Sequence, residues 1–164
     1  MKIIKWGLLV ILTVVLIFLY LNLGPGSPRN SASKFLTNIE EGQYEEAFEH
    51  VYFHDNAYDE DVTITLNEAK QIWVSRVEAL KAEGIYIKSY SGMKIRSNDG
   101  YPKGYVTLTV MENGEERVYE DVLISFVHNT TEDKWQVGNL QSLESNVGEE
   151  RNWEKAYRGF VGEK

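Results

Sequence analysis

The chain has 164 residues, no cysteine and a formal net charge of −8 at pH 7, and its length leaves room for one domain. Three of its 17 basic residues lie before residue 30, so the remainder carries 14 basic against 25 acidic residues, a net charge of −11. Such an acidic domain argues against nucleic acid as a partner, because phosphates are bound through Lys and Arg. The lack of cysteine excludes a lipid-modified cysteine anchor.

The first feature in chain order is an uncharged apolar run over residues 6–23, WGLLVILTVVLIFLYLNL. A helix with a rise of about 1.5 Å per residue would make this run roughly 27 Å long, close to the hydrocarbon thickness of a bilayer at about 30 Å. Lys2 and Lys5 precede the run, and the positive-inside rule keeps them in the cytoplasm. We therefore expect residues 1–23 to form a cytoplasmic stub and a transmembrane signal-anchor, in contact with the lipid bilayer through residues 6–23.

The rest of the chain is then expected outside, as the C-terminal domain of a single-pass protein of the cell membrane. Residues 24–30, GPGSPRN, contain two prolines and two glycines and predict a short linker. Residues 31–164 form the expected extracytoplasmic domain. The sequence leaves open whether the anchor is cleaved, since the segment Gly24-Pro25-Gly26 has the small residues of a cleavage site.

Three helices are expected at the start of this domain. Residues 31–42 and 43–53 have apolar side chains at helical spacing, and Gly42 is a natural stop between them. Thr65 and Glu68 have the spacing of a capping box in front of a longer amphipathic helix, which Gly84 ends. One stripe along this third helix is predicted to face the core: Leu66, Ala69, Ile72, Trp73, Val77 and Leu80.

From residue 85 onward the apolar residues alternate, which predicts strands over 85–96, 105–111, 117–128 and 134–143. Gly92 favours a bulge in the first strand, and Asn113-Gly114 favours a type I′ hairpin between the second and the third. The third strand is predicted to place four apolar side chains on one face: Val118, Val122, Ile124 and Phe126.

Helices followed by strands predict an α+β fold. We expect an N-terminal transmembrane helix, then helices packed on a curved antiparallel sheet of about four strands. One face of that sheet is expected to wrap the long third helix.

Two segments resemble the nuclear transport factor 2-like superfamily, whose cystatin-like cone is a curved sheet around helices. Residues 35–48, FLTNIEEGQYEEAF, resemble the two helices that open that fold, and residues 134–137, KWQV, resemble its late strand. The similarity spans roughly residues 31–143, and it is closest to membrane-anchored bacterial members of unknown function. It implies a cone with an open mouth, but no reaction, since the superfamily contains both enzymes and scaffolds.

No motif predicts a catalytic residue, a metal site or a cofactor. His50 and His54 are four apart, as two zinc ligands on a helix would be, but Val51 stands where a metalloprotease has Glu. The acidic run 55–61 lacks the Gly and Glu positions of a calcium loop. A general acid or base within a cone would come from a few scattered residues, and their spacing singles out no pair: Tyr86, Tyr90, His54 and Asp121.

The tail, residues 144–164, is polar but contains Trp153, Tyr157 and Phe160, spaced four and three apart. This spacing predicts a short helix with one aromatic face. Two roles are open for that face: it folds back onto the sheet, or it binds a partner, because aromatic side chains are enriched at the centres of interfaces. These three residues are the candidate binding residues of the sequence.

The sequence therefore favours a membrane-tethered, non-catalytic extracytoplasmic domain that binds a protein partner or a small ligand at the cell envelope. Two alternatives are a small cone-pocket enzyme or ligand carrier, and a component of a secretion or conjugation assembly. The first alternative requires a deep cavity with convergent polar groups, so a cone filled by Trp73, Phe126 and Trp135 would argue against it.

Overall fold

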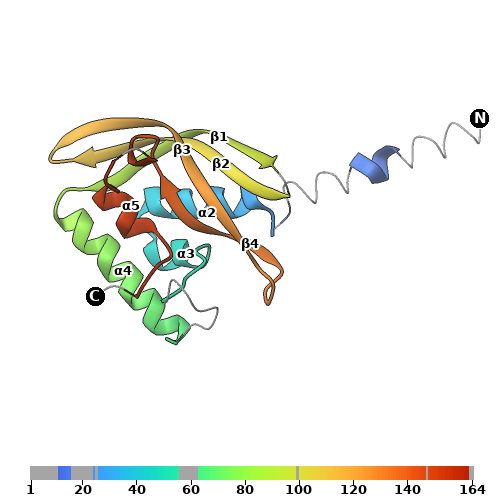
Figure 1. Ribbon diagram of the computed structural model, residues 1–164, viewed down its shortest axis with the longest axis horizontal. Coiled ribbons are helices and arrows are strands. Elements are labelled where there is room, and N and C mark those ends of the chain that lie inside the picture. The colour runs from blue at the N-terminus through green and yellow to red at the C-terminus, as the bar shows by residue number, and fades with distance from the viewer. Residues whose placement is uncertain are drawn as a thin grey trace, which may run out of the picture.

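The computed structural model describes residues 11–15, 24, 26–55, 63–98, 100–146 and 148–162. These ranges form an α+β domain in which helices precede a four-stranded antiparallel sheet, as the sequence predicts (Figure 1). The elements, in chain order, are α2 (Pro28–Glu41), α3 (Tyr44–Phe48), α4 (Leu66–Ala82), β1 (Tyr86–Asn98), β2 (Tyr101–Glu112), β3 (Glu115–Asn129), β4 (Lys134–Gln141), a 3₁₀ turn (Glu144–Asn146) and α5 (Asn152–Tyr157).

The expected membrane segment, residues 6–23, falls outside the described residues except for a helical stretch at 11–15. Apolar side chains of that stretch, among them Ile11 and Val14, are exposed. Within the part of the chain that the structure describes, no helix combines the length and the apolar character needed to cross a bilayer. The membrane anchor stays a prediction.

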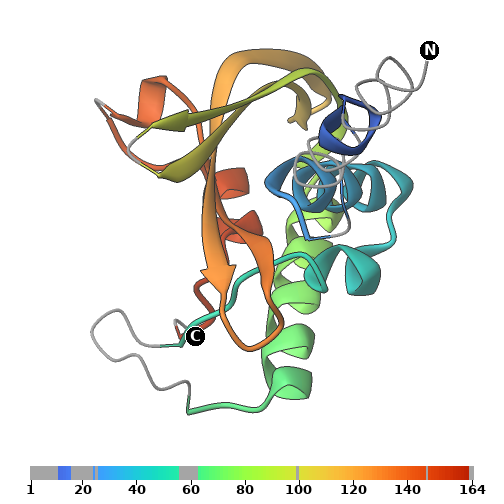
Figure 2. The same ribbon diagram turned by 90° about the vertical axis from the view of Figure 1, so that its right-hand side faces the viewer.

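The sheet is a simple meander in the order β1-β2-β3-β4, and it curves over the helices. Figures 1 and 2 show α2 beneath the arch of the strands, with α3 and α4 farther from the sheet and α5 between α4 and β4. The core fills this space with side chains from both layers. Its largest fully buried members include Trp73, Trp153, Tyr157 and Phe35.

Helix α2 begins earlier than expected, inside the range 24–30 that the sequence assigned to a linker. Ser27 caps the helix by accepting a hydrogen bond from the Asn30 N–H at 3.3 Å, and Pro28 occupies the first turn, where its missing N–H costs nothing. The N–H of Trp135 donates to the Gly26 carbonyl at 3.1 Å. The folded domain therefore starts at Gly26, because side-chain capping and a contact with β4 order the Pro- and Gly-rich segment.

Helix α4 has the predicted capping box: the Thr65 hydroxyl accepts from the Glu68 N–H, and the Glu68 carboxylate accepts from the Thr65 N–H at 2.9 Å. Most of its predicted stripe is buried, with Trp73 at the centre. Leu66 is the exception, since its side chain is 56% exposed. It occupies the first position of the helix, which extends beyond the sheet that would cover it (Figure 2).

The strand pairing has four register shifts, and only the one at Gly92 was predicted. The register of β1 on β2 shifts between Ser91 and Lys94, where Gly92 has a φ of 67°. Another shift lies in β3 at Asp121, a non-glycine residue with a φ of 51°. It reverses the face of every earlier side chain, so Val118 is 62% exposed instead of facing the core with Val122.

The C-terminal tail folds back and completes the core. The buried Glu154 carboxylate accepts hydrogen bonds from the N–H groups of Ser142 and Arg151 and from the Ser145 hydroxyl. The guanidinium of Arg76 on α4 donates to three tail carbonyls at 2.6–3.0 Å, those of Ala156, Arg158 and Phe160. This clamp joins residues 156–160 to helix α4.

Beyond α5, the tail also pairs with the extended segment that follows α3. The His54 N–H donates to the Gly159 carbonyl at 3.0 Å, and the Val161 N–H donates to the His54 carbonyl at 2.8 Å. Gly159 is required by this close approach, because a Cβ at this position would lie 1.9 Å from the Tyr52 carbonyl oxygen. The two backbones can be this close only where one of them has no side chain.

We predict that Gly159→Ala displaces the tail and lowers the free energy of unfolding by at least about 2 kcal/mol, as overpacked core positions do. Urea denaturation followed by tryptophan fluorescence measures this change. Gly148→Ala is the matched control, since a Cβ there meets only the Glu144 carbonyl oxygen, at 3.5 Å. Equal stability of the two variants would contradict the tight tail contact.

Candidate functional site

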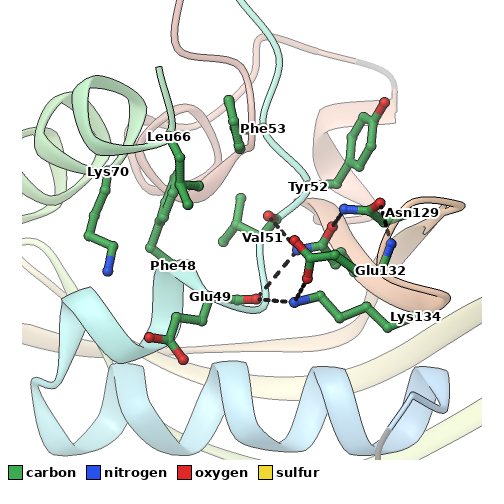
Figure 3. A pocket seen from close by; sticks show the side chains of 11 residues that line it. Phe48, Glu49, Val51, Tyr52, Phe53, Leu66, Lys70, Asn129, Glu132 and Lys134 are labelled. Atoms are coloured by element: carbon green, nitrogen blue, oxygen red, sulfur yellow. Dashed lines mark hydrogen bonds and ion pairs between the residues drawn. The ribbon is translucent and has the colours of Figure 1, made fainter. Parts of the chain in front are cut away.

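A surface groove of about 410 Å³ lies between helix α3, the start of α4 and the β3–β4 hairpin. This volume is within the range of small-molecule and side-chain binding sites. Figure 3 shows the side chains that line it. Its lining residues are Phe48, Glu49, Val51, Tyr52, Phe53, Leu66, Lys70, Asn129, Glu132, Lys134 and Gln136.

The floor of the groove is apolar. Phe48 and Val51 are buried, and the rings of Phe48 and Phe53 pack at 5.7 Å between centroids. Leu66 reaches the groove from the first turn of α4, where it is largely open to solvent (Figure 3). An exposed leucine beside two phenylalanines leaves apolar surface that an occupant would remove from water.

One wall of the groove is polar and is held rigidly by Gln136. Its buried amide donates to the Val51 carbonyl at 3.2 Å and accepts from the Asn129 amide at 2.9 Å. Lys134 on the same strand donates to the Glu49 carbonyl at 3.3 Å and forms an ion pair with Glu132 (Figure 3). These bonds fix the β3–β4 hairpin against the turn after α3, so this wall is already formed in the structure.

The three tail aromatics predicted as binding residues do not line this groove. Trp153 and Tyr157 are fully buried in the core, and Phe160 is half-buried beside His54, at 5.3 Å between ring centroids. The Tyr157 hydroxyl accepts from the Ile87 N–H at 3.5 Å, and burial raises the pKa of this tyrosine. In this arrangement the aromatics hold the domain together, and their binding of a partner stays a prediction.

Both histidines that follow α3 lie in partly buried positions. Burial, followed by the charges of Lys34 and Lys134, lowers the pKa of His50. Burial and the charge of Arg158 lower the pKa of His54. Within the described ranges, no group of three His, Cys, Asp or Glu side chains is placed to hold a metal ion.

The residues considered as a general acid or base are not brought together. The Tyr90 hydroxyl is hydrogen-bonded to Thr37 at 3.0 Å, and Asp121 is exposed at the bulge of β3. Tyr86 lies at the start of β1, with the Lys81 ammonium 5.9 Å from its ring centroid. Among the described residues, no hydrogen bond joins any two of Tyr86, Tyr90, His54 and Asp121.

Comparisons of the chain with family models, with curated proteins and with solved structures find no match. The chemistry of the site therefore rests on its own residues. Sequence reasoning missed the groove because it assigned Leu66 to the core stripe. The available signal was its place directly after the N-cap Thr65, where a helix end often projects beyond its packing partner.

We predict that the domain loses stability as the pH falls below about 6.5. With a pKa lowered in the folded state, His50 and His54 bind fewer protons there than in the unfolded chain, whose histidines titrate near 6.5. The free energy of unfolding should therefore decrease from pH 7 to pH 5.5, as measured by urea denaturation at each pH. Replacing both with Gln should flatten this dependence, and an unchanged slope in the double variant would refute the assignment.

Proposed function

We propose that the protein is a membrane-tethered, non-catalytic extracytoplasmic domain that binds a protein partner or a small ligand at the cell envelope. The groove beside Leu66 is the observation that carries the binding role. Its apolar floor accepts an apolar or aromatic group, and its preformed polar wall supplies orientation. We place the binding site here in preference to the tail, because Trp153 and Tyr157 are buried.

Two observations support the tether. One is the apolar run 6–23, and the other is the short stretch of chain between this run and the folded domain. The run ends at Leu23, and the first backbone contact between the N-terminal segment and the sheet is made by Gly26. Three residue steps span at most about 11 Å. An anchored chain would thus hold its domain directly at the membrane surface.

The order of helices before a curved sheet also supports our proposal that the domain is similar to the nuclear transport factor 2-like superfamily. Trp73 and Phe126 are buried within the arch, and Trp135 packs against the same core. Side chains thus fill the space in which a cone-pocket enzyme would hold its substrate, and this favours the binding role. A role within a secretion or conjugation assembly would use the groove as its docking surface.

We expect the full-length chain to be recovered in the membrane fraction and to stay there after an alkaline carbonate wash. Residues 6–23 would hold it, since charged side chains in mid-bilayer cost about 2.5–3.5 kcal/mol each and this run has none. Replacing Val14 and Val15 with Lys should release the chain or block its insertion. Wild-type chain found free in the cytosol would disprove the tether.

We expect Leu66→Asp to abolish binding in the groove without unfolding the domain. The substitution places a charge on the apolar floor at an exposed position, and a tenfold or greater loss of bound partner or ligand should follow. A photo-crosslinking residue at position 66 captures a protein partner in growing cells, and native mass spectrometry of the purified full-length chain detects a retained small ligand.

Val118 provides the matched control, because it is similarly exposed but lies on the sheet, outside the set of groove-lining residues. Crosslinks should form from position 66 and not from position 118. The same products from both positions, or the same retained ligand in wild type and Leu66→Asp, would show that the groove is not the binding site.

A further inference from the structure

The outer face of the β1–β2 hairpin gathers basic side chains in a domain that is otherwise acidic. Residues 94–105, KIRSNDGYPKGY, contain Lys94, Arg96 and Lys103 against one acidic residue. All three basic side chains are exposed. None of them takes part in an ion pair with another described residue.

The pairing of β1 with β2 places like charges opposite each other, and this repulsion is unfavourable in the isolated domain. Arg96 and Lys103 are directly opposite each other on neighbouring strands, and Lys94 is opposite Tyr105 on the same face. Like charges in directly opposed positions destabilise a strand pair. The ring of Tyr105, 5.5 Å from the Arg96 guanidinium, offers partial compensation only. An anionic group outside the chain would remove this repulsion.

The hairpin lies at the end of the domain where the chain enters the fold. Arg29 and Pro28 of α2 line one surface pocket together with Ser97, Gly100 and Pro102 of the hairpin. Figure 1 shows the tip of β1, the start of β2 and the start of α2 at the same end, which faces the viewer in Figure 2. The residues that precede Gly24 are the apolar run, so this end would face the bilayer.

Two acidic side chains at the same end have contacts within their own hairpin. Glu132 and Asp133 lie on the adjacent β3–β4 hairpin, where they pair with Lys134 and with His128, the latter at 3.4 Å. Neither carboxylate forms an ion pair with Lys94, Arg96 or Lys103, so the basic cluster keeps its positive charge. Tyr101, a hydrophobic side chain of the hairpin that is 70% exposed, adds an aromatic ring of the kind that favours the headgroup region.

From these observations we infer that the β1–β2 hairpin docks onto the anionic headgroups of the membrane that anchors the chain. The inference rests on the proposed tether. With at most about 11 Å of chain between Leu23 and Gly26, the end of the domain that carries the hairpin is held near the surface, where charges act over a Debye length of about 8 Å at physiological ionic strength. The docking holds the domain in one orientation relative to the membrane.

The experiment uses the full-length chain inserted into vesicles of phosphatidylcholine, with or without 30 mol% phosphatidylglycerol, an amount on the order of that in anionic leaflets. The absence of cysteine allows a single dye at Tyr101→Cys, and Val118→Cys labels a control position on the same sheet. Lipids with a quencher on the headgroup report whether each dye touches the surface.

We expect the dye at position 101 to be quenched at least threefold more strongly than the dye at 118 in the anionic vesicles. This difference is on the order of the contribution that one basic residue makes to binding at an anionic surface. Salt at about 0.5 M should remove the difference. Arg96→Gln with Lys103→Gln should remove it as well. Lys88→Gln with Lys155→Gln, which takes away the same charge elsewhere, should leave it intact.

Two results separate this inference from the tether on which it rests. A chain that does not float with the vesicles after an alkaline wash overturns both proposals. A chain that floats while its dye at position 101 behaves like the dye at 118, or is quenched equally without phosphatidylglycerol, overturns the hairpin docking and leaves the tether standing.

Discussion

Trp73 of α4 contacts aromatic rings from three other parts of the chain, and the rest of the domain is arranged around it. Its ring lies 6.2 Å from Phe35 of α2, 5.7 Å from Phe48 of α3 and 6.2 Å from Tyr157 of α5, measured between centroids. Such pairs add directional attraction to the burial of a large apolar area. Phe48 both contacts Trp73 and forms part of the floor of the groove, so the groove is held in place by the core.

Features with a local cause were predicted from the sequence. The capping box of Thr65 and Glu68, the left-handed stop at Gly42, the bulge at Gly92 and the turn at Asn113-Gly114 each depend on a few neighbouring residues, and the structure contains all of them. Such local features can be predicted from a single sequence because capping groups and positive φ angles are confined to few residue types.

Features that depend on distant contacts were missed. The bulge at Asp121 uses a residue without a strong turn signal, and its effect is to expose Val118, which alternation alone would bury. The segment before helix α2 is ordered by a distant contact, the bond from the Trp135 N–H to the Gly26 carbonyl, although the Ser27 cap in front of Pro28 is a local signal that the sequence analysis did not use. The groove arises where α4 projects past the sheet, and no periodicity along the chain reveals where a neighbouring element ends.

The pairing of His54 with Phe160 has a consequence for how the chain reaches its folded state. The two residues are about 100 positions apart, and the bridge between Val51 and Val137 joins positions almost as distant. Contacts that close such long loops form late and slow the search for the native topology. Until the segment that carries Tyr157 has been synthesised, Trp73 lacks one of its aromatic neighbours. A chain that stops before Tyr157 would therefore leave part of the core open to solvent.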